Sequence, residues 1–312
     1  MTHARKPEWL KVRAPGGERY THIKDTLRKY DLHTVCEEAH CPNVGECWGE
    51  GTATIMILGD TCTRGCRFCA VTTGNPRGAY DPREPEHTAR TIAAMGLDYV
   101  VITMVDRDDM IDGGAAHVAE TLRAIKRASP EILVEALVGD FSGGLRDVET
   151  VAREGRPDVF AHNVETVARL QRTVRDARCS LERSLAVLAH AKRVAPATYT
   201  KSSIMVGLGE THDEVLETMR ALRGVDVDVL TLGQYLRPSE KHLAVERFVH
   251  PDEFAEYARE GEAMGFRYVA SGPLVRSSYK AAEAFLRGAL GRAVPARTDD
   301  SGVKRLRLPV VP

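Results

Sequence analysis

Six of the seven cysteines fall within residues 36–69, where their thiols could bind metal or exchange electrons. They form two trios, the first with C-x4-C-x5-C spacing and the second with C-x3-C-x2-C spacing: Cys36, Cys41 and Cys47, then Cys62, Cys66 and Cys69. In a reducing cytosol, clustered thiols indicate metal or redox chemistry rather than disulfides. The seventh cysteine, Cys179, stands alone and is expected to be a small buried or half-exposed residue without a role.

The spacing of the trios favours iron–sulfur clusters over zinc. Structural zinc takes four ligands, often from two C-x2-C pairs, and neither trio provides such pairs. A zinc ion that borrows His33 or His40 as a fourth ligand is the alternative. A 4Fe–4S cube has four irons, usually each held by a thiolate, so three cysteines leave one iron open. An open iron could bind a substrate or a cofactor.

Apolar runs and helical patterns alternate along the rest of the chain. Short runs rich in Val, Ile and Thr predict strands buried on both faces, and they span residues 52–60, 98–106, 132–140, 158–165, 199–209 and 228–238. Apolar residues recur on one face of five predicted helices, at residues 85–97, 114–128, 145–155, 181–195 and 211–224. Repeated strand–helix units predict an α/β fold. Six strands are fewer than a complete barrel has, so we expect a partial (β/α)6-type TIM barrel.

In such a barrel the C-terminal ends of the strands form one rim, where catalytic residues gather. Chemically capable residues follow four of the predicted strands: Cys62, Cys66 and Cys69; Asp106, Arg107, Asp108 and Asp109; Asn163 and Glu165; and Gly207, Gly209 and Glu210. We therefore expect these residues, which are far apart in the sequence, to share one site.

The bulk composition narrows the range of partners. The formal net charge is −1 over 312 residues, so no basic excess argues for nucleic-acid binding. No apolar run approaches the ~18 residues of a membrane span, and the stretch MTHARKPEWLKV lacks the apolar core of a signal peptide. We expect a cytoplasmic protein that binds neither nucleic acid nor membrane.

Both trios resemble the motifs of one enzyme family. C-x3-C-x2-C with Phe68 before its last cysteine is similar to the signature of radical S-adenosylmethionine (SAM) enzymes. TVCEEAHCPNVGECW resembles the auxiliary-cluster motif of the lipoyl synthase family, and KPEWLKVRAP, ITMVDRDDMIDGGAAH and GPLVRSSYKA resemble that family too. The matching segments run from about residue 6 to residue 281, almost the whole chain.

The resemblance implies two 4Fe–4S clusters and S-adenosylmethionine as cofactors. It assigns the second trio to a cluster that cleaves S-adenosylmethionine to a radical, and the first trio, with a serine of the RSSY motif, to an auxiliary cluster: Cys62, Cys66 and Cys69, and Cys36, Cys41, Cys47 and Ser278. Serine is a poorer iron ligand than a thiolate, which would leave one corner labile. The implied reaction takes two sulfur atoms from the auxiliary cluster and inserts them at carbons 6 and 8 of an octanoyl chain.

The same resemblance divides the chain into three parts of one structural domain. Residues 1–50 would be an N-terminal extension that carries the auxiliary-cluster cysteines. Residues 51–270 would form the partial barrel, and residues 271–312 a C-terminal segment with the RSSY motif.

Five residues are candidates for binding S-adenosylmethionine. Phe68 lies within the second trio, while Asn163 and Glu165, two residues apart, point to the same side of a predicted strand. Gly207 would permit close approach of the backbone to a ligand. Lys201 could face the barrel lumen and meet the cofactor carboxylate. Each assignment has an alternative. Asn163 and Glu165 could belong to a hydrogen-bond network at the strand end, Gly207 to an ordinary turn, and Lys201 could point outward.

The family also implies protein partners. The octanoyl chain would be amide-linked to a lysine of a lipoyl carrier domain, such as those of 2-oxoacid dehydrogenases or the glycine cleavage H protein. A ferredoxin or flavodoxin would supply electrons, and an iron–sulfur cluster carrier would rebuild the auxiliary cluster. The rival hypotheses are a methylthiotransferase, which usually has an added RNA-binding domain, and a non-catalytic electron carrier, for which this chain is long.

Overall fold

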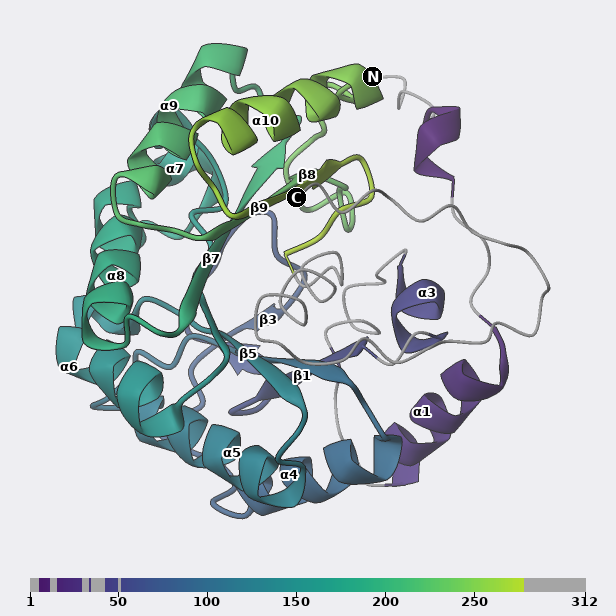
Figure 1. Ribbon diagram of the computed structural model, residues 1–312, viewed down its shortest axis with the longest axis vertical. Coiled ribbons are helices and arrows are strands. Elements are labelled where there is room, and N and C mark those ends of the chain that lie inside the picture. The colour runs from purple at the N-terminus through teal and green to yellow at the C-terminus, as the bar shows by residue number, and fades with distance from the viewer. Residues whose placement is uncertain (1–5, 12–15, 30–33, 35–42, 50–51, 278–312) are drawn as a thin grey trace.

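The computed structural model describes residues 6–11, 16–29, 34, 43–49 and 52–277. Figure 1 shows a curved sheet surrounded by an outer ring of helices. In the described part of the chain this sheet has seven strands, all parallel, in the order β1-β4-β5-β6-β7-β8-β9. The first and last of them form the two edges, so the barrel is partial and open on one side.

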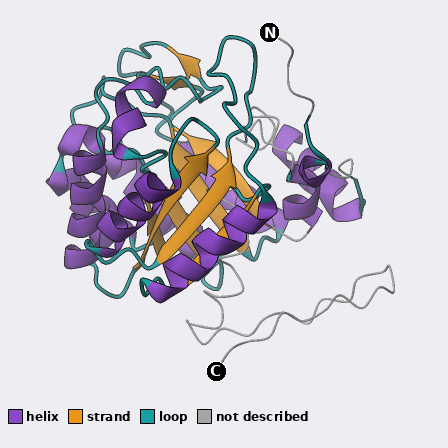
Figure 2. Cartoon of the chain, turned by 90° about the horizontal axis from the view of Figure 1, so that it is seen from above, coloured by secondary structure: helices purple, strands orange, loops and turns teal. Residues whose placement is uncertain are grey.

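The strands confirm the predicted fold class and extend it. They are β1 Thr52–Ile57, β4 Tyr99–Met104, β5 Leu133–Leu137, β6 Val159–Ala161, β7 Tyr199–Val206, β8 Val229–Gln234 and β9 Tyr268–Gly272. The first six correspond to the six predicted strands. The sequence analysis does not predict β9, because Ala, Ser and Gly, with weak strand preferences, make up most of YVASG. A separate pair, β2 Thr61–Cys62 and β3 Thr72–Thr73, lies at one end of the barrel (Figure 2).

All five predicted helices are present among the described residues, with others. The helices are α1 Glu18–Lys29, α3 Val44–Gly49, α4 Glu84–Met95, α5 Ala115–Ala128, α6 Leu145–Glu149, α7 Gln171–Val174, α8 Leu181–Val194, α9 His212–Arg223 and α10 Pro251–Ala263. The helix predicted over residues 145–155 continues beyond α6 as a π-helical turn, Thr150–Gly155. No described helix is long and apolar enough to span a membrane.

Alternate residues of each strand face the barrel lumen and the helices. Val100, Ile102 and Val134 pack with residues of the surrounding helices in the largest apolar cluster. Their strand neighbours Tyr99 and Val101 belong to a separate cluster formed by strand residues alone, with Leu133, Val159 and Val229. Because most of these residues begin their strands, this inner cluster closes the lumen at its N-terminal end.

A polar layer lies directly above that floor. Lys201, third in β7, donates to both oxygens of Glu135, third in β5, over 2.9 and 2.7 Å. The hydroxyl of Tyr99 donates to the same carboxylate over 2.5 Å. All three side chains are buried. The floor is thus held by an ion pair as well as by apolar packing.

Below the floor, a lysine–aspartate ion pair occurs at two places where the chain returns from a helix to the sheet. Lys126, near the end of α5, pairs with Asp158 just before β6, and Lys192, near the end of α8, pairs with Asp228 just before β8. Each carboxylate also accepts a hydrogen bond from the backbone of the neighbouring strand. Each aspartate therefore links a helix end to two strands.

The described part of the N-terminal extension packs on the open side of the barrel. Figure 1 shows α1 and α3 beside the sheet edge that β1 forms. Thr34 makes an antiparallel bridge with Ile55, which covers part of this edge. Trp48 of α3 is completely buried and stacks on Tyr20 of α1, with ring centroids 5.2 Å apart.

Candidate cluster and cofactor site

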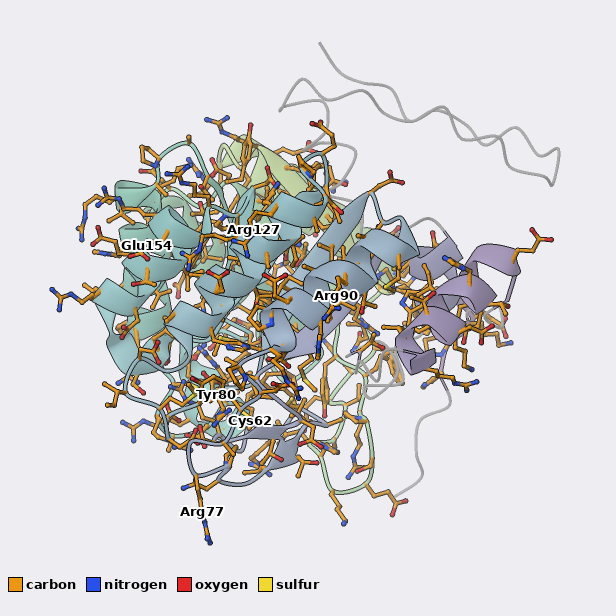
Figure 3. The ribbon with its side chains drawn as sticks, turned by 90° about the horizontal axis from the view of Figure 1, so that it is seen from below. Cys62, Arg77, Tyr80, Arg90, Arg127 and Glu154 are labelled. Carbon is orange, nitrogen blue, oxygen red and sulfur yellow. The ribbon has the colours of Figure 1, made fainter. Side chains whose placement is uncertain are left out.

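The second cysteine trio lies at the C-terminal end of the barrel, on the segment that follows β1. Cys62 ends β2, and Cys66 and Cys69 lie in the loop that leads to β3. Each of the three side chains is half-buried. In Figure 3, Cys62 and Tyr80 lie toward this end, while Arg127 and Glu154 lie on the outer helices. The trio therefore occupies the rim where the fold was expected to gather reactive groups.

Backbone hydrogen bonds fix the cysteine loop to two other parts of the rim. The amide of Thr63 donates to the carbonyl of Asp106, just after β4, over 2.9 Å. The amide of Arg67 donates to the carbonyl of Val174, at the end of α7, over 2.9 Å. The loop is thus held from both sides before any ligand is considered.

Arg64, between the first two cysteines, anchors the loop from within. Its guanidinium is 3% exposed and donates to Asp140 over 2.6 Å and to Asp108 over 2.8 and 3.0 Å. A buried charge needs this degree of pairing to offset its desolvation. The hydrogen bonds to Arg64 lower the pKa of Asp108, whereas burial raises the pKa of Asp106, 3.7 Å from Arg64, to about 6.

The neighbouring arginine, Arg107, supports the same rim. It is 1% exposed, forms a bidentate pair with Asp109, and donates to the carbonyls of Leu58 and Ala79 over 3.1 and 2.8 Å. Arg107 thus connects the end of β1, the loop after β4 and the segment before α4. The aspartate-rich loop after β4 is therefore joined to the rim through its arginine.

The three thiols of the second trio all have raised pKa values. Burial raises the pKa of Cys62, and it raises the pKa of Cys69 to about 11. A hydrogen bond with Cys179, together with burial, raises the pKa of Cys66. Such thiols ionise readily only when a cation compensates the negative charge, as bound iron does. Among the described residues, no three acidic, histidine or cysteine side chains surround a single ion position.

Cys179 is buried, as expected, and it lies against this loop. Its sulfur accepts a hydrogen bond from Arg64 over 3.3 Å. The contact with Cys66, followed by the charges of Arg175 and Arg64, lowers the pKa of Cys179. The sequence alone gives no signal for this contact, because 113 residues separate the two cysteines (179 − 66).

Asn163 and Glu165 lie beyond the end of β6, and the charge of Glu165 acts on two thiols of the cysteine loop, Cys66 and Cys69. Glu165 has a left-handed backbone, with φ of 67°, which is uncommon outside glycine and typical of functional sites. Burial raises the pKa of Glu165, while the charge of Arg175 and a hydrogen bond from Asn163 oppose the rise. After burial, the Glu165 charge also contributes to the raised pKa of Cys69. The two candidates and the cysteine loop therefore share one site.

His162, which precedes Asn163, points into the protein. Its Nδ1 donates to the carbonyl of Val138 over 2.8 Å, and its Nε2 lies 2.9 Å from the hydroxyl of Ser184. Since a carbonyl can only accept, Nδ1 must hold the proton of the neutral ring. Burial lowers the pKa of His162 to about 4.

The other two cofactor candidates have protein partners of their own. Lys201 faces the lumen, as one alternative held, but it is 1% exposed and paired with Glu135 near the floor. A Cβ at Gly207 would lie 2.2 Å from the Gln234 amide and 2.6 Å from the Arg247 carbonyl. The amide of Gly207 donates to Glu210. Protein packing alone therefore accounts for this glycine, and an ion pair for the lysine.

Phe68 packs against the loop that follows β8. It contacts an apolar cluster that contains Val174, Leu208 and Tyr235. In the same region His242 Nε2 lies 3.0 Å from the carbonyl of Cys69, and the amide of Leu243 donates to the carbonyl of Arg67. The cysteine loop is therefore covered by the loop after β8.

Most residues expected to hold the auxiliary cluster lie outside the described residues: Cys36, Cys41 and Ser278. Cys47 is described, and it is buried in α3 beside Trp48. Next to α3, the side-chain nitrogen of Asn43 donates to the carbonyl of Leu274 over 2.6 Å. The described ends of the two segments that carry the expected ligands therefore meet.

Comparisons with known proteins agree with this geometry. A model of the Radical SAM superfamily matches residues 56–222, more than half of the chain, and one of the N-terminal domain of lipoyl synthase matches residues 1–41. The lipoyl synthase of Sorangium cellulosum is 60% identical to the chain, and the match covers 96% of this chain and 85% of that protein. The mitochondrial lipoyl synthase of Rattus norvegicus is 57% identical, over 92% of this chain and 78% of that protein.

The chain belongs to the lipoyl synthase family. As a member it is a sulfur-transferring radical SAM enzyme, which acts on a protein-bound octanoyl group. Its cofactors are S-adenosylmethionine and 4Fe–4S clusters, including an auxiliary cluster. The predicted family, activity and cofactors are thereby confirmed.

Solved structures extend the comparison at the level of fold. Methylornithine synthase is 14% identical to this lipoyl synthase family member, with a TM-score of 0.54 over 88% of this chain and 94% of that one. The FeFe-hydrogenase maturase HydG of Carboxydothermus hydrogenoformans is 13% identical, with a TM-score of 0.53 over 86% of this chain and 78% of that one. Both support the partial barrel and, at such low identity, nothing further.

Proposed function

We propose that Cys62, Cys66 and Cys69 hold the 4Fe–4S cluster at which S-adenosylmethionine is cleaved. The observation that carries this assignment is the placement of three half-buried thiols on one clamped loop at the C-terminal rim. When bound, the cluster would supply an electron and an open coordination position. The protein would supply the shape of the loop, the buried charge of Arg64 behind it, and a cover of apolar side chains.

Asn163, Glu165 and Phe68 are the best supported contacts for S-adenosylmethionine. The carboxylate and amide of the first two face the cysteine loop and could bind the hydroxyl and amino groups of the cofactor. Phe68 could pack against its apolar parts. Lys201 and Gly207 would support the barrel around the cofactor without touching it.

The auxiliary cluster would be held by Cys36, Cys41, Cys47 and Ser278. The support for this proposal is the contact between the Asn43 and Leu274 segments, which border the first trio and the RSSY motif. The protein would orient the octanoyl chain between the two clusters and keep water from the reacting carbons. Two sulfur atoms would then enter at carbons 6 and 8.

The partners proposed are a lipoyl carrier domain, an electron donor such as ferredoxin or flavodoxin, and an iron–sulfur cluster carrier. The carrier domain would come from a 2-oxoacid dehydrogenase or from the glycine cleavage H protein. We propose a cytoplasmic location and no role for nucleic acid or membrane.

The activity is tested by anaerobic reconstitution of the protein with iron and sulfide. Mass spectrometry then follows an octanoylated carrier peptide incubated with S-adenosylmethionine and a reductant. We expect a product with two added sulfurs and release of 5′-deoxyadenosine. Deoxyadenosine without sulfur transfer would point to another substrate. Neither product from protein with about eight irons per chain would contradict the enzymatic proposal.

Ser278→Ala and Ser278→Cys test the assignment of the auxiliary ligands. Both variants should still release 5′-deoxyadenosine, because the radical-generating site is untouched. Both should lose most of the lipoyl product, since the corner of the auxiliary cluster changes from a labile alkoxide to no ligand or to a stable thiolate. Unchanged lipoyl yield in both variants would remove Ser278 from the proposal.

A further inference from the structure

Asn43 lies between two cysteines of the first trio and makes two contacts of different kinds. Its main-chain carbonyl accepts a hydrogen bond from the amide of Cys47 over 2.9 Å. Its side-chain nitrogen donates to the carbonyl of Leu274, 231 residues further along the chain, over 2.6 Å. The residue is 4% exposed. One buried asparagine thus connects Cys47 with the segment that leads to the RSSY motif.

The segment after β9 is also confined on its opposite side, by β8. A Cβ at Gly233 would lie 2.0 Å from the carbonyl oxygen of Val275, so the two backbones approach more closely than any side chain permits. Arg276 then donates to the carbonyl of Gln234 over 3.1 Å. The segment lies between Asn43 on one side and the end of β8 on the other.

We propose that Asn43 is a positioning residue for sulfur transfer: it ties the segment that leads into the RSSY motif to the helix that carries Cys47, and so brings together the two parts of the chain from which the auxiliary cluster would take its ligands. This inference rests on the ligand assignment proposed above. The cysteines and the serine stand at opposite ends of the chain, and the shared cluster cannot form unless the two ends meet in one register. The Asn43 side chain sets that register before the cluster is built.

The chemistry of the contact suggests a sharp substitution. Leu274 offers a carbonyl oxygen, which can only accept, so only the amide nitrogen of Asn43 can serve as the donor. Asn43→Asp keeps the size of the side chain but places an oxygen against an oxygen. The buried carbonyl then loses its partner and faces repulsion. Gly233→Ala disturbs the same segment from the other side, without touching the first trio.

Gly272→Ala provides the matched control. Gly272 pairs with Gly233 in the sheet, but a Cβ there would lie 3.4 Å from the Val275 side chain, an ordinary contact. Neither glycine has a positive φ, so both substitutions are free of backbone strain. The control therefore adds the same methyl group one strand away without moving the segment.

The first measurement uses full-length protein in which Cys62, Cys66 and Cys69 are replaced by alanine, so that only the auxiliary cluster is reconstituted. Mössbauer spectra of this background are compared with those of the same protein carrying Ser278→Ala, Asn43→Asp, Gly233→Ala or Gly272→Ala. Asn43→Asp and Gly233→Ala should reproduce the change that Ser278→Ala causes at the unique iron, and Gly272→Ala should not. In cluster-free protein, amide exchange of residues 274–277 should rise about tenfold or more in Asn43→Asp.

Product analysis in the otherwise unaltered enzyme completes the test. Asn43→Asp should lower lipoyl yield about tenfold while 5′-deoxyadenosine release stays within about twofold. If Ser278→Ala alters the spectrum and Asn43→Asp does not, the positioning role is overturned while the proposed ligands stand. If Ser278→Ala itself has no effect, the ligand assignment fails and this inference fails with it. Thermal melts identify any variant that has simply unfolded. If Asn43→Asp is unfolded, the spectrum of Gly233→Ala serves as the test of the positioning role.

Discussion

The two ends of the barrel pair their carboxylates with cations in different ways. At the N-terminal end each carboxylate pairs with a different lysine: Glu135 with Lys201, Asp158 with Lys126, and Asp228, which also pairs with Arg267, with Lys192. At the C-terminal end one guanidinium, that of Arg64, serves both Asp108 and Asp140 and also reaches the sulfur of Cys179. Because none of these lysines is shared, losing one of the pairs at the base leaves the other two intact. A shared partner makes a rim in which one loss reaches the whole cysteine loop.

Arg64→Ala should give the largest effect, because it removes the shared partner. The buried carboxylate of Asp140 would lose its closest counter-charge, while Asp108 would keep only its pair with Arg178. Breaking a buried pair costs about 3–5 kcal/mol. We expect the loop to open, iron to fall from about eight to about four per chain, and 5′-deoxyadenosine release to fall by roughly a hundredfold or more. Iron analysis and liquid chromatography of the anaerobic reaction measure these quantities.

Arg178→Ala is the control for this prediction. Arg178 also donates to Asp108, over 3.0 Å, but its side chain is 49% exposed. Exposed pairs contribute little, so deoxyadenosine release should stay within about threefold. Equal losses in the two variants would contradict the distinction between a buried shared partner and a surface one.

Lys201→Met tests the opposite end. It leaves the Glu135 carboxylate buried without its cation, which should lower the free energy of unfolding by about 3–5 kcal/mol. Chemical denaturation measures the loss. Adding Glu135→Gln should recover part of it, because no unpaired charge then remains. The folded variant should still bind S-adenosylmethionine with near-normal affinity. A stable variant that fails to bind the cofactor would restore the direct contact expected from the sequence.

His162 gives a pH-dependent test of the layer beneath the rim. Burial lowers its pKa from 6.5 to about 4, so above pH 6.5 the ring is neutral in both the folded and the unfolded chain. As the pH falls from 6.5 to about 4, the unfolded chain binds a proton that the folded protein refuses, and stability declines by about 3 kcal/mol. Below pH 4 this contribution levels off. The free energy of unfolding of His162→Gln should not show this decline between pH 6.5 and about 4. If the variant and the wild type lose stability in parallel over this range, His162 is not the cause.

Lys126→Met should have the smallest effect, about 1 kcal/mol or less. The lysine is paired with Asp158, but its side chain is 23% exposed, so water replaces much of what the pair contributes. Asp158 also keeps its hydrogen bond from the backbone of Val134. If Lys126→Met lowers the free energy of unfolding as much as Lys201→Met does, the contribution of an ion pair at the base of the barrel does not depend on its burial.

The sequence was sufficient for the fold class and for the rim at which the described candidate residues gather. Runs such as ILVEALVGD identify six of the seven strands, and parallel strands bring their C-terminal residues to one rim. It was not sufficient for β9, whose small residues acquire strand structure only through pairing with β8. The strand propensity of single residues does not include the stabilisation that pairing with a neighbouring strand provides.

Within the site, the spacing of residues in the sequence predicts candidate cluster ligands better than it predicts the residues that hold the cysteine loop in place. Three cysteines within eight residues predict a cluster because the chain itself brings them together. Arg64 meets Asp108 and Asp140 across 44 and 76 residues, so this network depends on which loops become neighbours. The alternation of strand residues correctly turns Lys201 toward the lumen. This alternation does not predict that Glu135 pairs with the lysine near the floor of the lumen.

Trp48 gives the molecule an optical property. It is one of only two tryptophans, it is fully buried on Tyr20, and it adjoins Cys47, whereas Trp9 is 38% exposed. An iron–sulfur cluster absorbs where indole emits and quenches nearby excited rings by energy transfer. The blue-shifted fluorescence of the buried indole should therefore fade as an auxiliary cluster is assembled and recover as the cluster is consumed. Sulfur donation could then be followed in real time, without any added dye.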